Sequence, residues 1–168
     1  MDAEGDMYRG GATTLGLAAT SAHPQNAGVQ EPLMQILLDH GARLEDPPMA
    51  GNQHGAVMGC LANGRWEAAV YLADRGARLN IVSAAGVGRL DVVQSCFDET
   101  GKLKPPHTAD DMGEAFRYAC FYGSRDVAKF LLDRGVDIAN HSGDGQTGVH
   151  YAGIGGQLEV MKLLVARG

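Results

Sequence analysis

The side chains in this sequence that could do chemistry are first of all its three cysteines and six histidines. Cys60, Cys96 and Cys120 include no CxxC pair and have no histidine at ligand spacing, so they do not predict a zinc site. An odd number of thiols also argues against a disulfide framework. Each cysteine lies in an apolar stretch, where a free thiol behaves as a small hydrophobic side chain. We therefore expect no metal, no cofactor and a reducing compartment.

Two other patterns could support chemistry, but each has a simpler interpretation. The glycine-rich segments Gly143–Gly145 and Gly153–Gly156 are similar to phosphate-binding loops, yet neither has the Lys-Ser/Thr pair of a P-loop. Asp110 and Asp111 could act as paired acids, but they stand at the start of a predicted helix, where carboxylates ordinarily cap. Since no nucleophile, base and orienting group come together, we predict that the protein is not an enzyme.

Recurring glycines indicate the elements that carry these side chains. A motif similar to Leu-Leu-Asp-Arg-Gly occurs four times, and a degenerate fifth copy ends at Gly101. The five closing glycines stand 35, 25, 34 and 33 residues apart and are Gly41, Gly76, Gly101, Gly135 and Gly168. Each closes an amphipathic run, and glycine readily takes the left-handed conformation that ends a helix. Three of the glycines follow an arginine, Arg75, Arg134 or Arg167, whose charge suits the negative end of the helix dipole.

A second set of glycines precedes these helices at a constant interval and marks the end of an earlier helix. Its members are Gly64, Gly88, Gly123 and Gly156. Each repeat is therefore predicted to be two antiparallel helices joined by a glycine turn. Such a pair buries both of its faces only when repeats stack on one another.

This unit resembles the ankyrin repeat, whose 33 residues carry a T-P-L-H-x-A signature in the first helix. The best match is Gly145–Ala152, which departs from the signature mainly at Gly148 and Val149. His150 takes the signature position, where the resemblance implies a hydrogen-bonded contact within the scaffold. The resemblance implies an all-α fold, an α-solenoid of stacked antiparallel helix pairs with short hairpin or turn connections. We expect a single domain over residues 1–168, with approximate repeats 11–46, 50–80, 81–101, 109–140 and 142–168.

Two stretches depart from the regular repeat. The first repeat has about seven extra residues between its helices, where Pro24 and Gly28 predict a loop. The third repeat is short, because Asn80 leads almost directly into its first helix, and we expect it to lack the usual preceding hairpin. An irregular connection then runs from Gly101 to Thr108.

For function, the resemblance implies a protein-binding module that uses the concave face made by hairpin tips and first helices. Mapped position by position, that face comprises Arg117, Tyr118, Phe121, Tyr122, Asp144, Gln146, Tyr151, Ile154, His54, Asn63 and Val87. Four of these residues are aromatic in a chain that is 6% aromatic, and aromatic rings dominate interface energetics. We expect Phe121 and Tyr122 to be exposed. Tyr118 and Tyr151 either join them or pack between adjacent first helices.

Charge and hydropathy narrow the class of partner. The net charge of −6 disfavours nucleic acid, whose binding needs clustered cations. No apolar stretch reaches the length that crosses a bilayer, so we expect a cytoplasmic protein that does not bind membranes. Acids near the predicted tips would favour a basic protein partner, and these are Asp110, Asp111, Asp137 and Asp144.

Three alternatives remain open from the sequence. Residues 20–32 and 101–108 could form a small-molecule or enzymatic site, because long irregular loops often carry function. The repeats could instead be a spacer or cap within a larger polypeptide. Finally, the last repeat has an apolar face without the polar finish of a terminal repeat, so the array could self-associate or continue beyond this segment.

Overall fold

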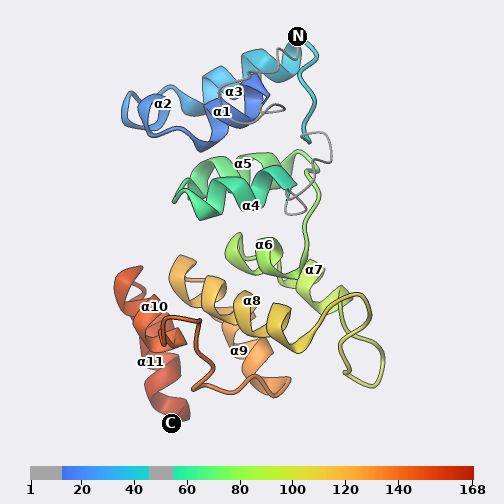
Figure 1. Ribbon diagram of the computed structural model, residues 1–168, viewed down its shortest axis with the longest axis vertical. Coiled ribbons are helices and arrows are strands. Elements are labelled where there is room, and N and C mark those ends of the chain that lie inside the picture. The colour runs from blue at the N-terminus through green and yellow to red at the C-terminus, as the bar shows by residue number, and fades with distance from the viewer. Residues whose placement is uncertain (1–12, 46–54) are drawn as a thin grey trace. The chain divides into compact units, whose positions relative to one another are not determined.

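The computed structural model describes residues 13–45 and 55–168, and in this part of the chain the regular elements are all helices (Figure 1). The helices are α1 (Thr14–Thr20), α2 (Ala22–Asn26), α3 (Gln30–Asp39), α4 (Gly55–Ala62), α5 (Trp66–Asp74), α6 (Ile81–Gly86), α7 (Leu90–Ser95), α8 (Ala109–Tyr122), α9 (Arg125–Asp133), α10 (Gly148–Ile154) and α11 (Leu158–Arg167). The predicted all-α class is therefore confirmed. The chain divides into two compact units, one up to Leu79 and one from Asn80.

The first unit consists of two helix pairs. Helix α1 packs on α3, and α4 packs on α5, while α1 also contacts α4 (Figure 1). Leu15, Met34, Val57 and Leu72 are almost completely buried in these contacts. Each helix thus hides its apolar side only with the help of its neighbours, as the repeat predicts.

The insertion of the first repeat is a short helix, α2, and the prediction of a loop was wrong. The Ser21 hydroxyl accepts a hydrogen bond from the His23 amide at 3.2 Å and caps the helix. Pro24 is tolerated because it stands in the first turn, where its missing N–H has no helical partner to bond. Gln25 then ties α2 to the next pair, since Arg65 Nη1 donates to its Oε1 at 2.7 Å.

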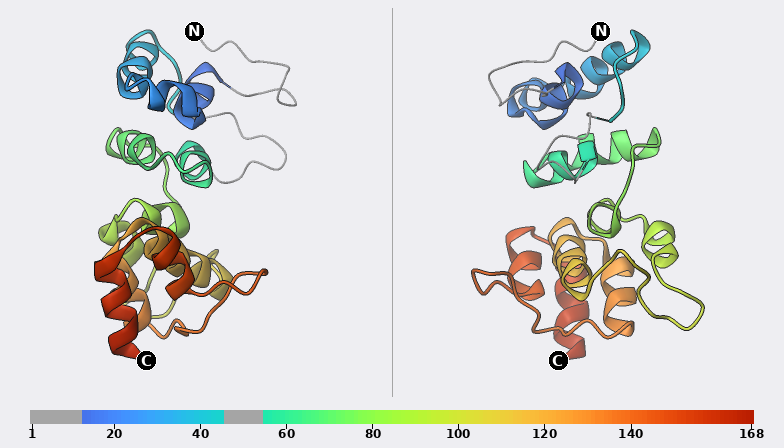
Figure 2. Two further views of the ribbon diagram at one scale, coloured as in Figure 1. Left: turned by 90° about the vertical axis from the view of Figure 1, so that its left-hand side faces the viewer. Right: turned by 45° about the vertical axis from the view of Figure 1, so that its right-hand side comes forward.

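The second unit repeats the pair three times. The first helices α6, α8 and α10 pack on one another in that order, and the second helices α7, α9 and α11 do the same beside them (Figure 2). Between these two layers lie buried side chains such as Phe116, Leu131 and Val160. Small residues of the first helices, among them Ala115, are fully buried and allow close packing.

The predicted helix ends are confirmed at most of the glycines. Gly123, for example, has φ 79° and ends α8, and Gly135 has φ 92° just after α9. Positive φ values are also found at Gly41, Gly64, Gly76, Gly88 and Gly156. The basic residues before two of these glycines also stack on rings, with Arg75 over Tyr71 and Arg134 over Phe130.

Gly101 does not end a helix, which corrects the fifth copy of the motif. Helix α7 stops at Ser95, and the chain turns back so that Phe97 and Leu103 form an isolated β-bridge. Asp98 Oδ1 accepts hydrogen bonds from the amides of Thr100 and Lys102, at 2.8 and 2.9 Å. Because this side chain offers the backbone an alternative to the helix, α7 has only 6 residues and Gly101 lies in the turn.

Helix α6 begins directly after Asn80, as the shortened third repeat predicts. Asn80 Oδ1 accepts from the Ser83 amide at 2.8 Å, and Ser83 Oγ accepts from the Asn80 amide at 3.0 Å. This reciprocal pair is a capping box, which starts the helix without a preceding hairpin.

Candidate protein-binding surface

Helix α8 carries four of the eleven predicted binding residues, and its start is set by Thr108 and Asp111. The Asp111 amide donates to Thr108 Oγ1 at 3.2 Å, while the Thr108 amide donates to Asp111 Oδ2 at 2.7 Å. The interpretation of Asp111 as a capping residue is therefore confirmed. From this cap α8 runs for 14 residues, which brings Arg117 to Tyr122 to its second half.

Helix α10 supplies the other part of the surface and is positioned by a hairpin and a second capping box. His141 and Thr147 form a β-bridge, and Gly145 lies in the turn between them. The Thr147 amide donates to His150 Nδ1 at 3.2 Å. His150 thus serves the scaffold, as the resemblance implied.

Two glycines allow α10 to lie very close to α8. A Cβ atom on Gly148 would stand 2.7 Å from Phe116 Cε1, and one on Gly155 would stand 2.0 Å from the Phe121 carbonyl oxygen. Neither distance is compatible with a methyl group. The departure from the ankyrin signature at Gly148 therefore has a local cause, which is the Phe116 ring in the space of a larger side chain.

The four predicted aromatic residues lie together where α8 meets α10, and we call Tyr118, Phe121, Tyr122 and Tyr151 the aromatic cluster. The ring centroids of Phe121 and Tyr122 are 4.8 Å apart, those of Tyr118 and Tyr122 are 6.2 Å apart, and those of Phe121 and Tyr151 are 6.3 Å apart. These are favourable spacings for aromatic pairs. Burial raises the pKa of Tyr118, with a smaller contribution from Glu114.

All four rings are half-buried, and this refines the expectation for each pair. Phe121 and Tyr122 are not fully exposed, because each ring covers part of the other. Tyr151 packs across to Phe121 and still keeps part of its surface in solvent. The cluster is therefore a supported surface rather than a set of independent side chains.

Polar residues border the aromatic cluster. Arg117 donates from Nη1 to Asn140 Oδ1, and Asp144 is exposed at the hairpin tip, where it accepts from the Ser142 hydroxyl. That hydrogen bond lowers the pKa of Asp144, and Arg117 adds a smaller effect in the same direction. The Gln146 carbonyl accepts from the Ser142 amide at 3.0 Å, which closes the turn.

The remaining predicted residues do not all join this group. Ile154 lies on α10 and is 64% exposed. Val87 is the half-buried residue at the end of α6. Asn63 belongs to the first unit, where it is exposed and donates to the Gly59 carbonyl at 2.8 Å. His54 lies outside the described residues.

The three cysteines do not have the properties of nucleophiles. All three are free and buried. Burial raises the pKa of the Cys120 thiol to about 12 and also raises that of Cys96. A reactive cysteine needs the opposite shift. Within the described residues, no group of three or more histidine, cysteine and acidic side chains could hold a metal ion.

One surface was missed by the sequence reasoning. A hollow of about 350 Å³ lies in the first unit against α3 and α5, and the exposed ring of Trp66 is part of its wall. The sequence did contain a signal for this surface. Counted back from the closing glycine, Trp66 stands at the position that Arg125 fills in the helix before Gly135. Only the packing of α5 on α3 shows that this position faces a hollow.

Comparison with known proteins identifies the repeat. A family model described as ankyrin repeats (3 copies) matches residues 81–168, more than half of the chain. The mouse protein fem-1 homolog A-like is 35% identical over 48 residues, which cover 29% of this chain and 7% of that protein. The E3 ubiquitin-protein ligase hecd-1 of Caenorhabditis elegans is 36% identical over 61 residues, which cover 36% of this chain and 2% of the ligase. The chain spans less than a tenth of the length of either relative.

No helix in residues 13–45 and 55–168 is long and apolar enough to cross a membrane. Ankyrin repeats are in general protein–protein interaction modules, and the family is in general not catalytic. With its paired helices, its glycine turns and the match over residues 81–168, this chain belongs to the ankyrin repeat family.

Proposed function

We propose that this ankyrin repeat chain binds a partner protein through the aromatic cluster, with Ile154 and the hairpin around Asp144 at its edge. The observation that carries the proposal is the contact of four half-buried rings from two neighbouring first helices. The concave face of which they are part is taken from the family resemblance. The further positions His54, Asn63 and Val87 belong to the proposal on the same ground.

The physical reason is the low entropic cost of ordered rings. A tyrosine or phenylalanine that already rests on its neighbours loses little rotamer freedom when a partner covers it. Interface residues of this kind often cost 2 kcal/mol or more in binding when truncated to alanine. The aromatic cluster thus has the chemistry of an interface centre, and its polar border has the chemistry of a rim.

The experiment that tests the proposal is affinity capture from a native lysate with three forms of the protein. These are the wild type, the double variant Phe121→Ala with Tyr122→Ala, and the control Leu158→Ala, which removes an exposed apolar side chain from α11. A partner captured by wild type and control but lost with the double variant supports the proposal. Equal recovery of every captured protein with all three forms contradicts it.

The proposal includes a compartment and excludes a class of ligand. Three buried free thiols suit a reducing environment such as the cytoplasm. The acidic balance of the sequence favours a basic protein over nucleic acid. The ligase activity in the name of the Caenorhabditis elegans relative is that protein's own, and we do not extend it to this chain.

The loop-based alternative has less support than the aromatic cluster. Residues 20–32 include α2, which hydrogen bonds fasten to the start of α5, and Asp98 organises the turn that precedes residues 101–108. Of residues 20–32 only Glu31, on α3, lines the hollow beside Trp66, and residues 101–108 line neither that hollow nor the one at α10 and α11. We retain one domain over the whole chain as part of the proposal.

Self-association is a second candidate, favoured by an apolar hollow of about 530 Å³ at α10 and α11. Its wall includes Ile138, Val149, Leu164 and Val165, and the last of these is 72% exposed. Sedimentation velocity over a concentration series tests this candidate. A rising sedimentation coefficient that Val165→Glu abolishes supports a dimer through this face, and a monomer at all concentrations contradicts it.

A further inference from the structure

The hollow of the first unit combines an aromatic floor with an acidic rim. Trp66, Val70 and Tyr71 of α5 provide the apolar wall, and the Trp66 side chain is 40% exposed. The rim carries three carboxylates and one guanidinium, which belong to Glu31, Glu67, Asp74 and Arg75. We call this feature the α3–α5 groove. It lies on second helices of the first unit, whereas the aromatic cluster lies on first helices of the second unit.

The guanidinium of the α3–α5 groove is already engaged. Arg75 stacks over the Tyr71 ring with its Cζ 3.4 Å from the ring centroid, and its Nη2 donates to Gln35 Oε1 at 2.8 Å. Among the ion pairs of the described residues, none includes Glu31, Glu67 or Asp74. The groove therefore presents net negative charge beside an exposed indole.

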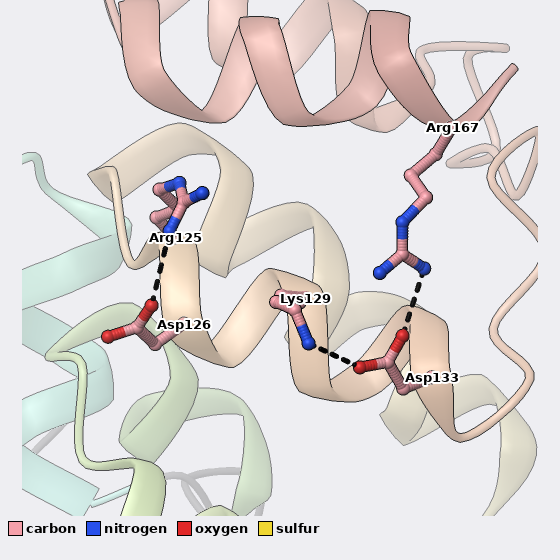
Figure 3. A network of polar contacts seen from close by, with 5 residues as sticks. All are labelled: Arg125, Asp126, Lys129, Asp133 and Arg167. Atoms are coloured by element: carbon pink, nitrogen blue, oxygen red, sulfur yellow. Dashed lines mark hydrogen bonds and ion pairs between the residues drawn. The ribbon is translucent and has the colours of Figure 1, made fainter.

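The equivalent helices of the second unit show how the repeat satisfies such carboxylates internally. Lys129 Nζ lies 2.8 Å from Asp133 Oδ2, and Arg167 Nη1 reaches from α11 to Asp133 Oδ1 at 2.9 Å (Figure 3). On α11, Lys162 pairs with Glu159 at 2.7 Å, and this contact lowers the pKa of Glu159, with a smaller effect from Arg125. The α9–α11 face thus supplies its own cations.

Position by position, the first unit lacks three of those four cations and keeps only Arg75, at the position of Arg167. Counted back from the closing glycines, Glu67 is equivalent to Glu159, but Val70 replaces Lys162 and Glu31 replaces Arg125. Leu158 is replaced by Trp66, whose ring is the best acceptor of a cation among aromatic side chains. The α3–α5 groove therefore keeps the carboxylate of Glu159 as Glu67 and adds a carboxylate at the position of Arg125. In place of the Lys162 cation it has the apolar Val70, beside the Trp66 indole.

We propose that the α3–α5 groove binds an arginine side chain presented by a basic segment of a partner protein. A planar guanidinium can stack on the Trp66 indole while its N–H groups donate to Glu31 and Glu67. It would supply from outside the charge that Arg125 and Lys162 supply on the other face. This site goes beyond the aromatic cluster, and loss of either surface leaves the other in place.

The test uses the full chain and a short synthetic peptide of alternating glycine and arginine. Because Trp66 is the only tryptophan of the protein, its fluorescence reports on this groove alone. We expect a saturable change in emission with the arginine peptide and none with the same peptide containing uncharged citrulline. Peptide binding that leaves Trp66 emission unaltered, or an equal response to citrulline, overturns the proposal.

Matched variants separate a specific site from general attraction to an acidic protein. Glu31→Gln with Glu67→Gln removes two carboxylates from the α3–α5 groove, while Asp126→Asn with Glu159→Gln removes two from the α9–α11 face. We expect the first pair to weaken peptide binding about tenfold or more and the second pair to leave it nearly unchanged. Equal weakening by both pairs overturns the proposal.

A substitution that keeps the total of acidic residues gives the sharpest comparison. Val70→Lys installs the counterpart of Lys162 three residues after Glu67 and should fill the groove with an internal cation. We expect it to abolish the response of Trp66 to the peptide, while the exposed control Leu158→Lys, with the same change in net charge, should retain most of it. An undiminished response in Val70→Lys contradicts the proposal.

Discussion

The two faces built from second helices differ in chemistry although they share one framework. In the second unit, the acids of α9 and α11 are paired with Lys129, Lys162 and Arg167. In the first unit, the corresponding helices carry acids but have Val70 at the position of Lys162 and Trp66 at the position of Leu158. Since the helix ends and buried residues follow the same pattern in both units, the fold does not require Val70 and Trp66 at these positions. Exposed positions that depart from an internally satisfied pattern are therefore where a repeat protein can carry recognition.

The largest expected effect is on the stability of the repeat framework. It is tested by substitutions at two equivalent turn positions. Gly155→Ala places a methyl group where only 2.0 Å separates it from the Phe121 carbonyl oxygen, a backbone atom that cannot rotate away. Its φ of −76° is allowed for alanine, so the cost is one of space. We expect a loss of about 2 to 4 kcal/mol in the free energy of unfolding, measured with denaturant.

The control for that substitution is the equivalent position of the first unit, which is Asn63. Its side chain is exposed and makes one hydrogen bond to the Gly59 carbonyl. Asn63→Ala should change the free energy of unfolding by less than about 1 kcal/mol. Similar losses of stability for both variants would show that tight packing at this turn position is not specific to the second unit.

The next effect separates stability from binding at the aromatic cluster. Phe121→Ala with Tyr122→Ala removes two half-buried rings, which should cost about 1 to 3 kcal/mol in stability. Once a partner is known, calorimetric titration should show a loss of about 2 kcal/mol or more in binding free energy at a temperature where the variant remains folded. Unchanged affinity in the folded variant would exclude the cluster as an interface.

Much of the fold followed from the sequence because its signals are local. Glycine at a helix end acts through its own backbone, and Thr147 and His150 meet within one turn. These features were predicted correctly. The aromatic cluster was also found in the sequence, because its residues occupy positions that the repeat brings together.

The predictions failed where a side chain forms hydrogen bonds that interrupt the repeat pattern, or where residues distant in sequence come together. Asp98 binds the backbone of Thr100 and Lys102, so Gly101 lies in a turn that its motif alone does not reveal. Ser21 caps α2 in a stretch where proline and glycine suggested a loop. The α3–α5 groove depends on helices from two successive repeats. Such contacts can be judged only when the helices have been placed.

The smallest effect tests whether the cations of the α9–α11 face act as electrostatic partners. Hydrogen bonds from Lys129 and Arg167 hold the pKa of the exposed Asp133 below its usual value. A carboxyl group with a lowered folded-state pKa contributes stability above its unfolded value, near 3.9, and that contribution is lost as the pH falls through the folded-state pKa. Asp133→Asn should therefore lower the melting temperature slightly at pH 7, and less at acid pH or high salt.

Asp39→Asn at the equivalent position of the first unit removes a carboxylate whose hydrogen-bond donor is the neutral Gln35, at 2.7 Å. Its effect should depend less on salt, and an equal salt dependence in the two variants would mean that the pairs of Figure 3 do not distinguish the two faces.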